Sequence, residues 1–197
     1  MMPYSFFAML FRMKYIHRWA LMRNTSSENL SEHAMETAAI THALAVIRNR
    51  RFGGSLDTGR AALIGLFHDC TEIITGDLPT PIKYHDPSIQ DSYKQLETEA
   101  AKRMLAMLPQ EMQEEYSSLL IPQEQDKELW KLCKAADKLA ALIKCMEEEK
   151  LGNKEFESAK RATLTKLEQI DLPELAVFME EYLPAFALTL DELNKGE

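Results

Sequence analysis

Apolar residues recur at three- and four-residue spacings along most of this chain, which is the periodicity of helices with one buried face. In the first such segment, Phe7, Leu10 and Phe11 would share one face. Prolines exclude a helix between residues 77 and 81. The predicted helices cover residues 4–16, 29–50, 57–75, 88–108, 109–119, 124–150 and 153–170, and Pro173 and Pro184 bracket the last elements. The pattern predicts an all-α fold, a compact helical bundle with mostly short loops.

Three residues indicate where individual helices begin. Ser88 and Asn153 carry side chains suited to an N-cap, and Pro109 suits the first turn of a short helix. No repeat, low-complexity tract or long linker divides the sequence. We therefore expect residues 1–197 to form a single domain, which at this length can bury a substantial core.

Composition supports this picture and narrows the partners. The chain has only 7 Gly and 8 Pro, and apolar residues make up 46% and charged residues 27% of it, as in an ordinary globular protein. The net charge of −8 argues against a polymeric nucleic-acid partner, because duplex binding requires a basic surface. A small anion is different, since a local arginine and a metal ion can bind it whatever the global charge.

The cysteines and the N-terminus bear on the compartment. Cys70, Cys133 and Cys145 form no CxxC pair, and buried free thiols in a reducing cytosol explain them best. No apolar run approaches the ~20 residues that span a bilayer. Residues 1–27 contain no acidic side chain and superficially resemble a transit peptide, but an amphipathic first helix is the preferred interpretation. We expect a cytoplasmic protein without membrane contact.

The third predicted helix carries the most informative chemistry. Residues 61–67 have no polar side chain, so this segment is expected to be buried on every side. It continues into His68, Asp69 and Glu72, and the i,i+3 and i,i+4 spacings place Glu72 on a face with the other two. Buried carboxylates repel each other unless a cation or a proton lies between them, and a divalent metal would resolve that conflict.

Two more candidates lie on other predicted helices, and each has a structural alternative. The His-Asp dipeptide alone could be a simple ion pair. His33, in the first turn of the second helix, could be a surface histidine near a cap. Asp137, on the flank of an apolar stripe, could pair with Lys134 or Lys138.

Taken together, the order His…His-Asp…Asp on three separate helices resembles the HD-domain metal-dependent phosphohydrolases. Longer motifs are similar to those of the bacterial 5′-deoxynucleotidases of that superfamily. These motifs are Arg18-Trp19, Arg23-Asn24, Glu-Asn-Leu-Ser-Glu-His at 28–33, Phe-His-Asp-Cys-Thr-Glu at 67–72 and Gly-Asp-Leu-Pro-Thr-Pro at 76–81. The resemblance covers essentially the whole chain and implies one HD-type domain.

The resemblance implies that His33, His68, Asp69 and Asp137 hold one divalent metal ion. Two imidazoles and two carboxylates without a thiolate suit Co, Mn, Zn or Fe, and they leave positions for water and a phosphate oxygen. We assign Glu72 as the general acid/base, because it lies one turn beyond the His-Asp pair. The alternative is that Glu72 only orients His68.

Substrate contacts are expected on both sides of this group. The planar fork of Arg18 suits phosphate oxygens, although any single arginine is more often a surface residue. Trp19 is interpreted as core or pocket wall. By resemblance, Asp77 accepts a hydrogen bond from the sugar 3′-hydroxyl and its packed loop leaves no room for a 2′-hydroxyl. The implied substrate-binding residues are Arg18, Trp19, His33, Asp69, Asp77, Leu78, Pro79, Thr80 and Asp137.

The leading functional prediction is hydrolysis of deoxyribonucleoside 5′-monophosphates to deoxynucleoside and phosphate, by a homodimer. One alternative keeps the metal chemistry with a triphosphate, a cyclic nucleotide or guanosine tetraphosphate as substrate. Another is a non-catalytic nucleotide-binding module of the same fold. His17, His42 and His85 are interpreted as bystanders.

Overall fold

The computed structural model describes residues 3–79 and 86–194, and every regular element in these two ranges is helical, which confirms the all-α class. The α-helices are α1 (Phe6–Leu10), α2 (Leu30–Arg51), α3 (Thr58–Phe67), α4 (Glu72–Thr75), α6 (Pro87–Leu105), α7 (Gln110–Leu120), α8 (Lys127–Lys150), α9 (Glu157–Glu168), α10 (Pro173–Glu181) and α11 (Leu190–Leu193). Short 3₁₀ segments are η1 (Phe11–Tyr15), η2 (Glu124–Asp126), η3 (Lys154–Phe156) and η4 (Leu183–Ala187).

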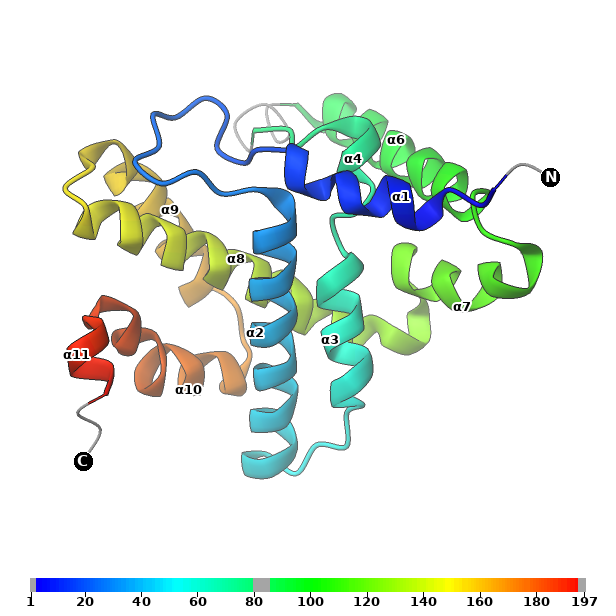
Figure 1. The fold of residues 1–197 in the computed structure, drawn as a ribbon. Coiled ribbons are helices and arrows are strands. Elements are labelled where there is room, and N and C mark those ends of the chain that lie inside the picture. Colours follow the sequence, from blue (N-terminus) through cyan, green and yellow to red (C-terminus); the bar gives the residue numbers. More distant parts are fainter. Residues whose placement is uncertain (1–2, 80–85, 195–197) are drawn as a thin grey trace.

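Helix α2 is the centre of the bundle. Helix α3 runs beside it, α8 crosses it and contacts both, and α10 packs near its C-terminal half (Figure 1). The buried side chains form a connected apolar core that includes Leu30 and Leu44 of α2, Ile64 of α3, and Leu132 and Leu139 of α8. The three helices that carry the predicted metal ligands therefore meet over the same core.

A glycine lets α2 and α3 approach each other closely. A Cβ at Gly65 would lie 2.7 Å from the Cα of Ala38 and 2.9 Å from Oγ1 of Thr41. Any larger residue would push the two helices apart, because a packed core has no free volume to absorb the clash. This close approach brings the end of α3 next to the start of α2.

The start of α2 is fixed by its cap. The side chain of Asn29 accepts hydrogen bonds from the backbone N–H groups of Ser31 and Glu32, and the Glu32 carboxylate accepts from the N–H of Asn29. This capping box satisfies the otherwise free donors of the first turn. His33 directly follows it, so its backbone is held rigidly.

The predicted third helix is interrupted. Helix α3 ends at Phe67, residues 68–71 form turns, and α4 begins at Glu72. The backbone N–H groups of Cys70 and Glu72 bond to carbonyls three residues earlier, which tightens the chain at this point. The prediction that residues 61–67 are buried on every side is also wrong. Leu63 and Leu66 are 44% and 40% exposed, because α3 lies at the edge of the bundle.

Other boundaries shift by smaller amounts. The predicted first helix forms two short pieces, α1 and η1, and the predicted helix at 124–150 begins with η2. Asp86, not Ser88, caps α6, because its side chain accepts from the N–H of Ser88, and Pro109 takes the N-cap position of α7 instead of its first turn. The prediction for Asn153 is confirmed, since its side chain accepts from the N–H of Glu155.

Two further sequence predictions concern burial. Cys70, Cys133 and Cys145 are free and buried, and burial raises the pKa of each thiol. Within the described ranges, no helix combines the length and the apolar character that crossing a bilayer requires.

Candidate metal centre

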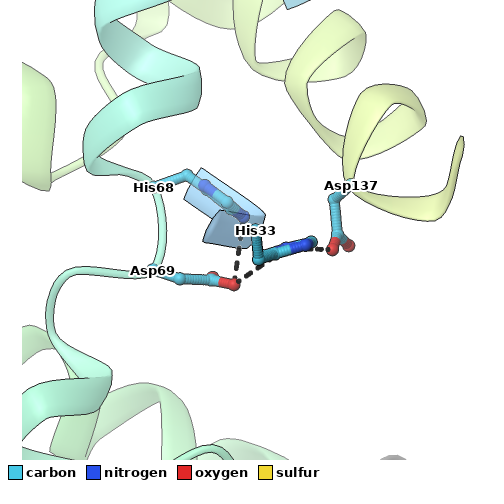
Figure 2. Close-up of side chains that lie close together, drawn as sticks. All are labelled: His33, His68, Asp69 and Asp137. Atoms are coloured by element: carbon cyan, nitrogen blue, oxygen red, sulfur yellow. Dashed lines mark ion pairs between the residues drawn. The ribbon is translucent and has the colours of Figure 1, made fainter. Parts of the chain in front are cut away.

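Four side chains from three parts of the chain converge at one point. His33 comes from α2, His68 and Asp69 from the turn that follows α3, and Asp137 from α8 (Figure 2). One potential ligand atom from each residue lies within 4.8 Å of all the others. The structure therefore brings together all four residues that the sequence predicted as metal ligands.

Imidazole nitrogens face carboxylate oxygens throughout this group. Nε2 of His33 lies 3.2 Å from Oδ1 of Asp137 and 3.6 Å from Oδ2 of Asp69. Nε2 of His68 lies 3.0 Å from the same Asp69 oxygen. The His33 side chain is fully buried, whereas those of Asp69 and Asp137 are 23% and 35% exposed, so the centre opens to solvent on its carboxylate side.

The structural alternatives for these residues fail. His33 is not a surface histidine, because its side chain has no exposed area. The ion-pair partner of Asp137 is His33, and the neighbouring Lys138 donates instead to the carbonyl of Lys134. His68 and Asp69 do form an ion pair, but this pair is one part of the larger group.

A backbone carbonyl determines which nitrogen of His68 faces the centre. Nδ1 of His68 lies 2.8 Å from the carbonyl oxygen of Gly65, which can only accept a hydrogen bond. Nδ1 must therefore carry a proton, so Nε2 is the nitrogen that can offer a lone pair to a metal ion. Metal-ligating histidines usually hold their second nitrogen in this way.

The second nitrogen of His33 faces a carboxylate that the sequence analysis did not assign. Nδ1 lies 3.4 Å from Oε1 of Glu28, which is 7% exposed. Glu28 belongs to one of the motifs quoted above, but no role follows from its position before a helix cap. A buried carboxylate near a histidine becomes visible only in three dimensions.

The charges in this group support one another. Burial raises the pKa of Asp69, yet the interactions of its carboxylate with the neighbouring His68 more than offset this effect, and the net pKa is lowered. Asp137 follows the same pattern, with the hydrogen bond from His33 lowering its pKa well below the usual range. Burial and Arg18 lower the pKa of His33, but Asp137 and Glu28 raise it to about 9.

A proton on His33 therefore holds the carboxylates together near neutral pH. A divalent cation between the same groups can replace that proton, because it favours ionised carboxylates and neutral imidazoles. The donor set of two imidazole nitrogens and two carboxylate oxygens fits a divalent transition metal. The centre is thus chemically suited to the ion that the sequence predicted.

Arg18 lies at the edge of the centre and is not a surface arginine. Its side chain is 11% exposed, with Nε 3.3 Å from Oε1 of Glu28 and Nη1 3.6 Å from Oδ2 of Asp69. Burial lowers the pKa of Arg18, but Asp137 and the other nearby carboxylates raise it by more, so the net pKa is above its usual value. The centre therefore has a permanent cation on one side.

Trp19 is half-buried beside Arg18, and its side chain is held from two sides. Its indole N–H donates to Oε2 of Glu28 at 2.6 Å, and its rings lie 5.2 Å from the ring of Phe156. Its backbone has φ of 59°, in the left-handed region.

The remaining predicted residues follow the turn. Glu72 is buried at the start of α4. The spacing argument assumed that one continuous helix carries both His68 and Glu72, and this assumption is wrong, because the chain turns between them. Gly76, with φ of 77°, ends α4, and residues 77–79 form a half-buried loop. Burial raises the pKa of Asp77, although Arg18 opposes the shift.

Four further residues from the sequence analysis lie outside the described ranges or away from the centre. Thr80 and His85 lie outside the described residues. His17 and His42 are exposed and take no part in the four-residue group, as expected of bystanders.

Comparisons with known proteins agree with this geometry. The sequence model of a family described as 5′-deoxynucleotidase YfbR-like matches residues 5–186. A 5′-deoxynucleotidase of Vibrio atlanticus is 47% identical over 189 residues, which are 96% of this chain and 97% of that protein. A 5′-deoxynucleotidase of Yersinia pseudotuberculosis is also 47% identical, over 96% of each chain.

Solved structures show a similar fold. An HD-domain phosphohydrolase from Listeria innocua has a TM-score of 0.77 and 21% identity, covering 92% of this chain and 88% of that one. A cyanophage S-2L HD phosphohydrolase, bound to dA and one catalytic Zn²⁺ ion, has a TM-score of 0.63 and 18% identity, covering 90% and 95%. The arrangement of helices is therefore that of the HD-domain phosphohydrolases.

Proposed function

This chain belongs to the YfbR-like 5′-deoxynucleotidase family, and we propose that it uses the centre at His33, His68, Asp69 and Asp137 to hydrolyse deoxyribonucleoside 5′-monophosphates. The products are a deoxynucleoside and inorganic phosphate. The observation that carries the proposal is the convergence of these four ligand atoms within 4.8 Å. Residues 1–197 act as one HD-type domain in this proposal, which the connected core supports.

The two histidines would hold one divalent metal through Nε2, and Asp69 and Asp137 through carboxylate oxygens. When bound, such an ion lowers the pKa of water and offsets charge on a phosphoryl group. Co, Mn, Zn and Fe all suit this donor set, and we propose cobalt among the ions that support turnover. The one catalytic Zn²⁺ ion bound by the cyanophage HD phosphohydrolase supports a transition metal in a protein of this fold.

Arg18 would bind the phosphate. Its Nε faces Glu28 and its Nη1 faces Asp69, so the guanidinium group lies flat against the edge of the centre. A planar guanidinium group can donate two parallel hydrogen bonds to phosphate oxygens, which fixes the phosphate in one orientation. Its raised pKa keeps this charge at every relevant pH.

Glu72 would act as the general acid/base, accepting a proton from the attacking water and returning one to the leaving 5′-oxygen. The alternative role, orienting His68, is already filled. Nδ1 of His68 donates to the Gly65 carbonyl and Nε2 faces Asp69, so neither nitrogen requires Glu72.

The sugar would be bound by the loop after Gly76. Asp77 would accept from the 3′-hydroxyl, while Leu78, Pro79 and Thr80 would restrict space near C2′. The half-buried position of residues 77–79 and the electrostatic influence of Arg18 on Asp77 support this arrangement. Trp19 would contribute through its backbone, because its indole N–H is engaged by Glu28. His33, Asp69 and Asp137 would border the phosphate as metal ligands.

The test is a phosphate-release panel. Protein stripped with a chelator and reloaded with Co, Mn or Zn is incubated with dAMP, AMP or dATP. We expect rapid release from dAMP, slow release from AMP, and no release without metal. Turnover of dATP alone would indicate a triphosphate substrate and contradict the proposal.

The role of Glu72 has its own test. Glu72→Gln should retain metal and nucleotide binding but lose about 10²–10⁴-fold in kcat, which is the typical contribution of a positioned general acid or base. Glu111→Gln, an exposed residue on α7, is the matched control and should retain wild-type kcat. A Glu72→Gln variant within a few-fold of wild type would remove Glu72 from the mechanism.

We further propose a cytoplasmic homodimer. The buried free thiols suit a reducing compartment. Leu63 and Leu66 are exposed on α3, and Phe7 and Phe11 are exposed near the N-terminus, which supports an apolar contact surface. Leu66→Glu should convert a dimer to a monomer in light scattering, whereas Leu190→Glu on α11 should not. A monomeric wild-type protein would contradict this part of the proposal.

A further inference from the structure

Glu28 is a buried carboxylate on which three nitrogen donors converge. Its Oε2 accepts the indole N–H of Trp19 at 2.6 Å. Its Oε1 lies 3.3 Å from Nε of Arg18 and 3.4 Å from Nδ1 of His33. Of the residues that carry these donors, His33 is within the metal group and Arg18 is at its edge. A single carboxylate therefore touches both.

The backbone places Glu28 directly opposite Arg18. The N–H of Arg18 donates to the carbonyl of Glu28 at 3.0 Å, and the N–H of Leu30 donates to the carbonyl of Ile16 at 2.9 Å. The segment before α2 thus pairs with the segment after η1 as a short antiparallel contact between His17 and Asn29. This contact fixes the Arg18 and Glu28 backbones before any side-chain interaction forms.

Trp19 shows strain at this point. Among the residues that the structure describes, it is the one non-glycine residue with positive φ, at 59°. A bulky side chain adopts this conformation only where its surroundings impose it. Here the conformation directs the indole N–H onto Glu28, while the rings pack near Phe156 and the carbonyl accepts from the side chain of Asn24.

We infer that Glu28 is a positioning residue that aligns the metal ligand His33 and the phosphate-binding Arg18 through the same carboxylate. Its carboxylate, 3.4 Å from Nδ1 of His33, favours a proton on that nitrogen, so Nε2 is the nitrogen left to offer a lone pair to a metal ion beside Asp69 and Asp137. As a partner of Nε of Arg18, it turns the remaining guanidinium nitrogens toward the open side of the centre. Trp19 holds the carboxylate in the orientation that serves both.

This inference rests on the proposed function for the role of Arg18, but its metal-binding part does not depend on activity. Glu28 faces Nδ1 of His33, whereas Asp69 and Asp137 face Nε2 of the same ring. Glu28 is therefore not one of the proposed metal ligands. Its effect on the ion must therefore pass through His33. Loss of such an outer carboxylate typically lowers metal affinity about 10–100-fold.

The main test is Glu28→Gln, which keeps the size of the side chain but replaces one acceptor oxygen with a donor. We expect about 10–100-fold weaker cobalt binding in competition with a chelator. We also expect a higher KM for dAMP, with kcat at saturating metal and substrate within a few-fold of wild type. If Glu28 had only a structural role, Glu28→Gln would lower the amount of folded protein, but its folded fraction would keep the wild-type KM and kcat.

Trp19→Phe is the milder variant, because it removes the indole N–H but keeps a ring beside Phe156. It should shift cobalt affinity and KM in the same direction by less. Glu174→Gln is the matched control. Glu174 is a fully buried carboxylate paired with Nε of Arg48 at 2.9 Å on α2, and it lies outside the centre. This variant should lose stability while its folded form keeps wild-type cobalt affinity.

Two outcomes would overturn the inference. The first is wild-type cobalt affinity and KM in Glu28→Gln, or in Trp19→Phe if Glu28→Gln does not fold. The second is an equal loss of cobalt affinity in Glu174→Gln, which would indicate general destabilisation. A wild-type protein without activity on dAMP would refute the proposed function but leave the cobalt-affinity comparison valid.

Discussion

Two carboxylates of helix α8, Asp137 and Glu148, lie about three turns apart in different surroundings. Glu148 is fully buried, and every partner it has is a donor. The donors are the backbone N–H groups of Thr25 and Ser26, Nζ of Lys144 and Nδ2 of Asn153. Asp137 has one close partner, Nε2 of His33 at 3.2 Å, and about a third of its side chain is exposed.

The difference separates a structural carboxylate from a functional one. The anchor formed by Glu148 is complete, because its donors satisfy both oxygens, and it ties the loop before α2 to α8. The partners of Asp137 are instead other potential metal ligands, since one atom each of His33, His68, Asp69 and Asp137 lies within 4.8 Å of the others. A buried acid is therefore not by itself a sign of a site, whereas a cluster of acids and imidazoles from separate parts of the chain is one.

Asp137→Asn should produce the largest effect. The amide keeps the shape of the side chain but removes a charged ligand, so activity on dAMP should fall by about 10³-fold or more, because the metal supplies several kcal/mol of transition-state stabilisation. Metal content after dialysis should fall with it. The metal-free variant should remain folded and lose about 1.5–3 kcal/mol, the value of one hydrogen bond to a charged group. Stoichiometric metal and wild-type activity in this variant would contradict the functional assignment of Asp137.

Glu148→Gln should show the opposite pattern. Breaking a buried ion pair on one side typically costs about 3–5 kcal/mol, because Lys144 is left uncompensated. Urea unfolding of metal-free protein should detect this loss, while the folded form keeps wild-type cobalt affinity. Lys160→Gln removes an exposed ion pair with Glu149 and serves as the control, with little expected change. Unchanged unfolding of Glu148→Gln would mean that its hydrogen bonds do not anchor the loop.

Gly65→Ala should lower both the stability of the fold and the affinity for cobalt, each modestly. The added Cβ would press on Ala38 and Thr41, and overpacking of this kind costs about 1–3 kcal/mol. The same separation of α2 and α3 would move His68 away from His33, so cobalt affinity should also fall. Gly59→Ala is the control on the same helix, because its Cβ would meet only Oδ1 of Asp57 at 3.4 Å. Equal behaviour of the two variants would refute the importance of close packing at Gly65.

The two regions should also differ in their dependence on pH. The hydrogen bond from Lys144 outweighs the effect of burial and lowers the folded-state pKa of Glu148, so its stabilisation is present above the ordinary glutamate pKa and is lost as the pH falls below it. Burial and Arg18 lower the pKa of His33, but Asp137 and Glu28 raise it to about 9, so its contribution is present below pH 6.5 and is lost as the pH rises through about 9.

The expected result is a small loss of thermal stability of the metal-free protein at alkaline pH, about 2–4 °C for each kcal/mol in a chain of this size. Scanning calorimetry from pH 6 to 10 with a chelator measures it. Bound metal should remove this alkaline change, because His33 is then unprotonated at all these values. A His33→Gln variant that keeps the full alkaline change would assign it to another group.

The metal ligands could be predicted from the order His…His-Asp…Asp and the motifs around it, which resemble a known family, whereas each residue taken singly had a structural alternative. His68 and Asp69 follow an apolar run, and Asp137 interrupts an apolar stripe. Glu28 could not be predicted in this way. Its role depends on the backbone contact that places it opposite Arg18, and on the left-handed backbone of Trp19 that turns the indole toward it.

The bundle itself was predictable from periodicity, but the break after Phe67 was not. Residues 57–75 carry a continuous helical pattern, and only the i→i+3 bonds of the turn end the helix at that point. The exposure of Leu63 and Leu66 was missed for a related reason. Apolar residues around a helix predict burial, whereas the neighbours of α3 cover only part of its surface.

The most direct measurement is a titration of chelator-stripped protein with Co²⁺, following the visible absorption of the ion and phosphate release from dAMP in parallel. Both signals should rise together and reach a plateau at one ion per chain, and His33→Gln should lose both. A plateau at two ions, or full phosphate release before any ion is added, would contradict a single metal held by His33, His68, Asp69 and Asp137.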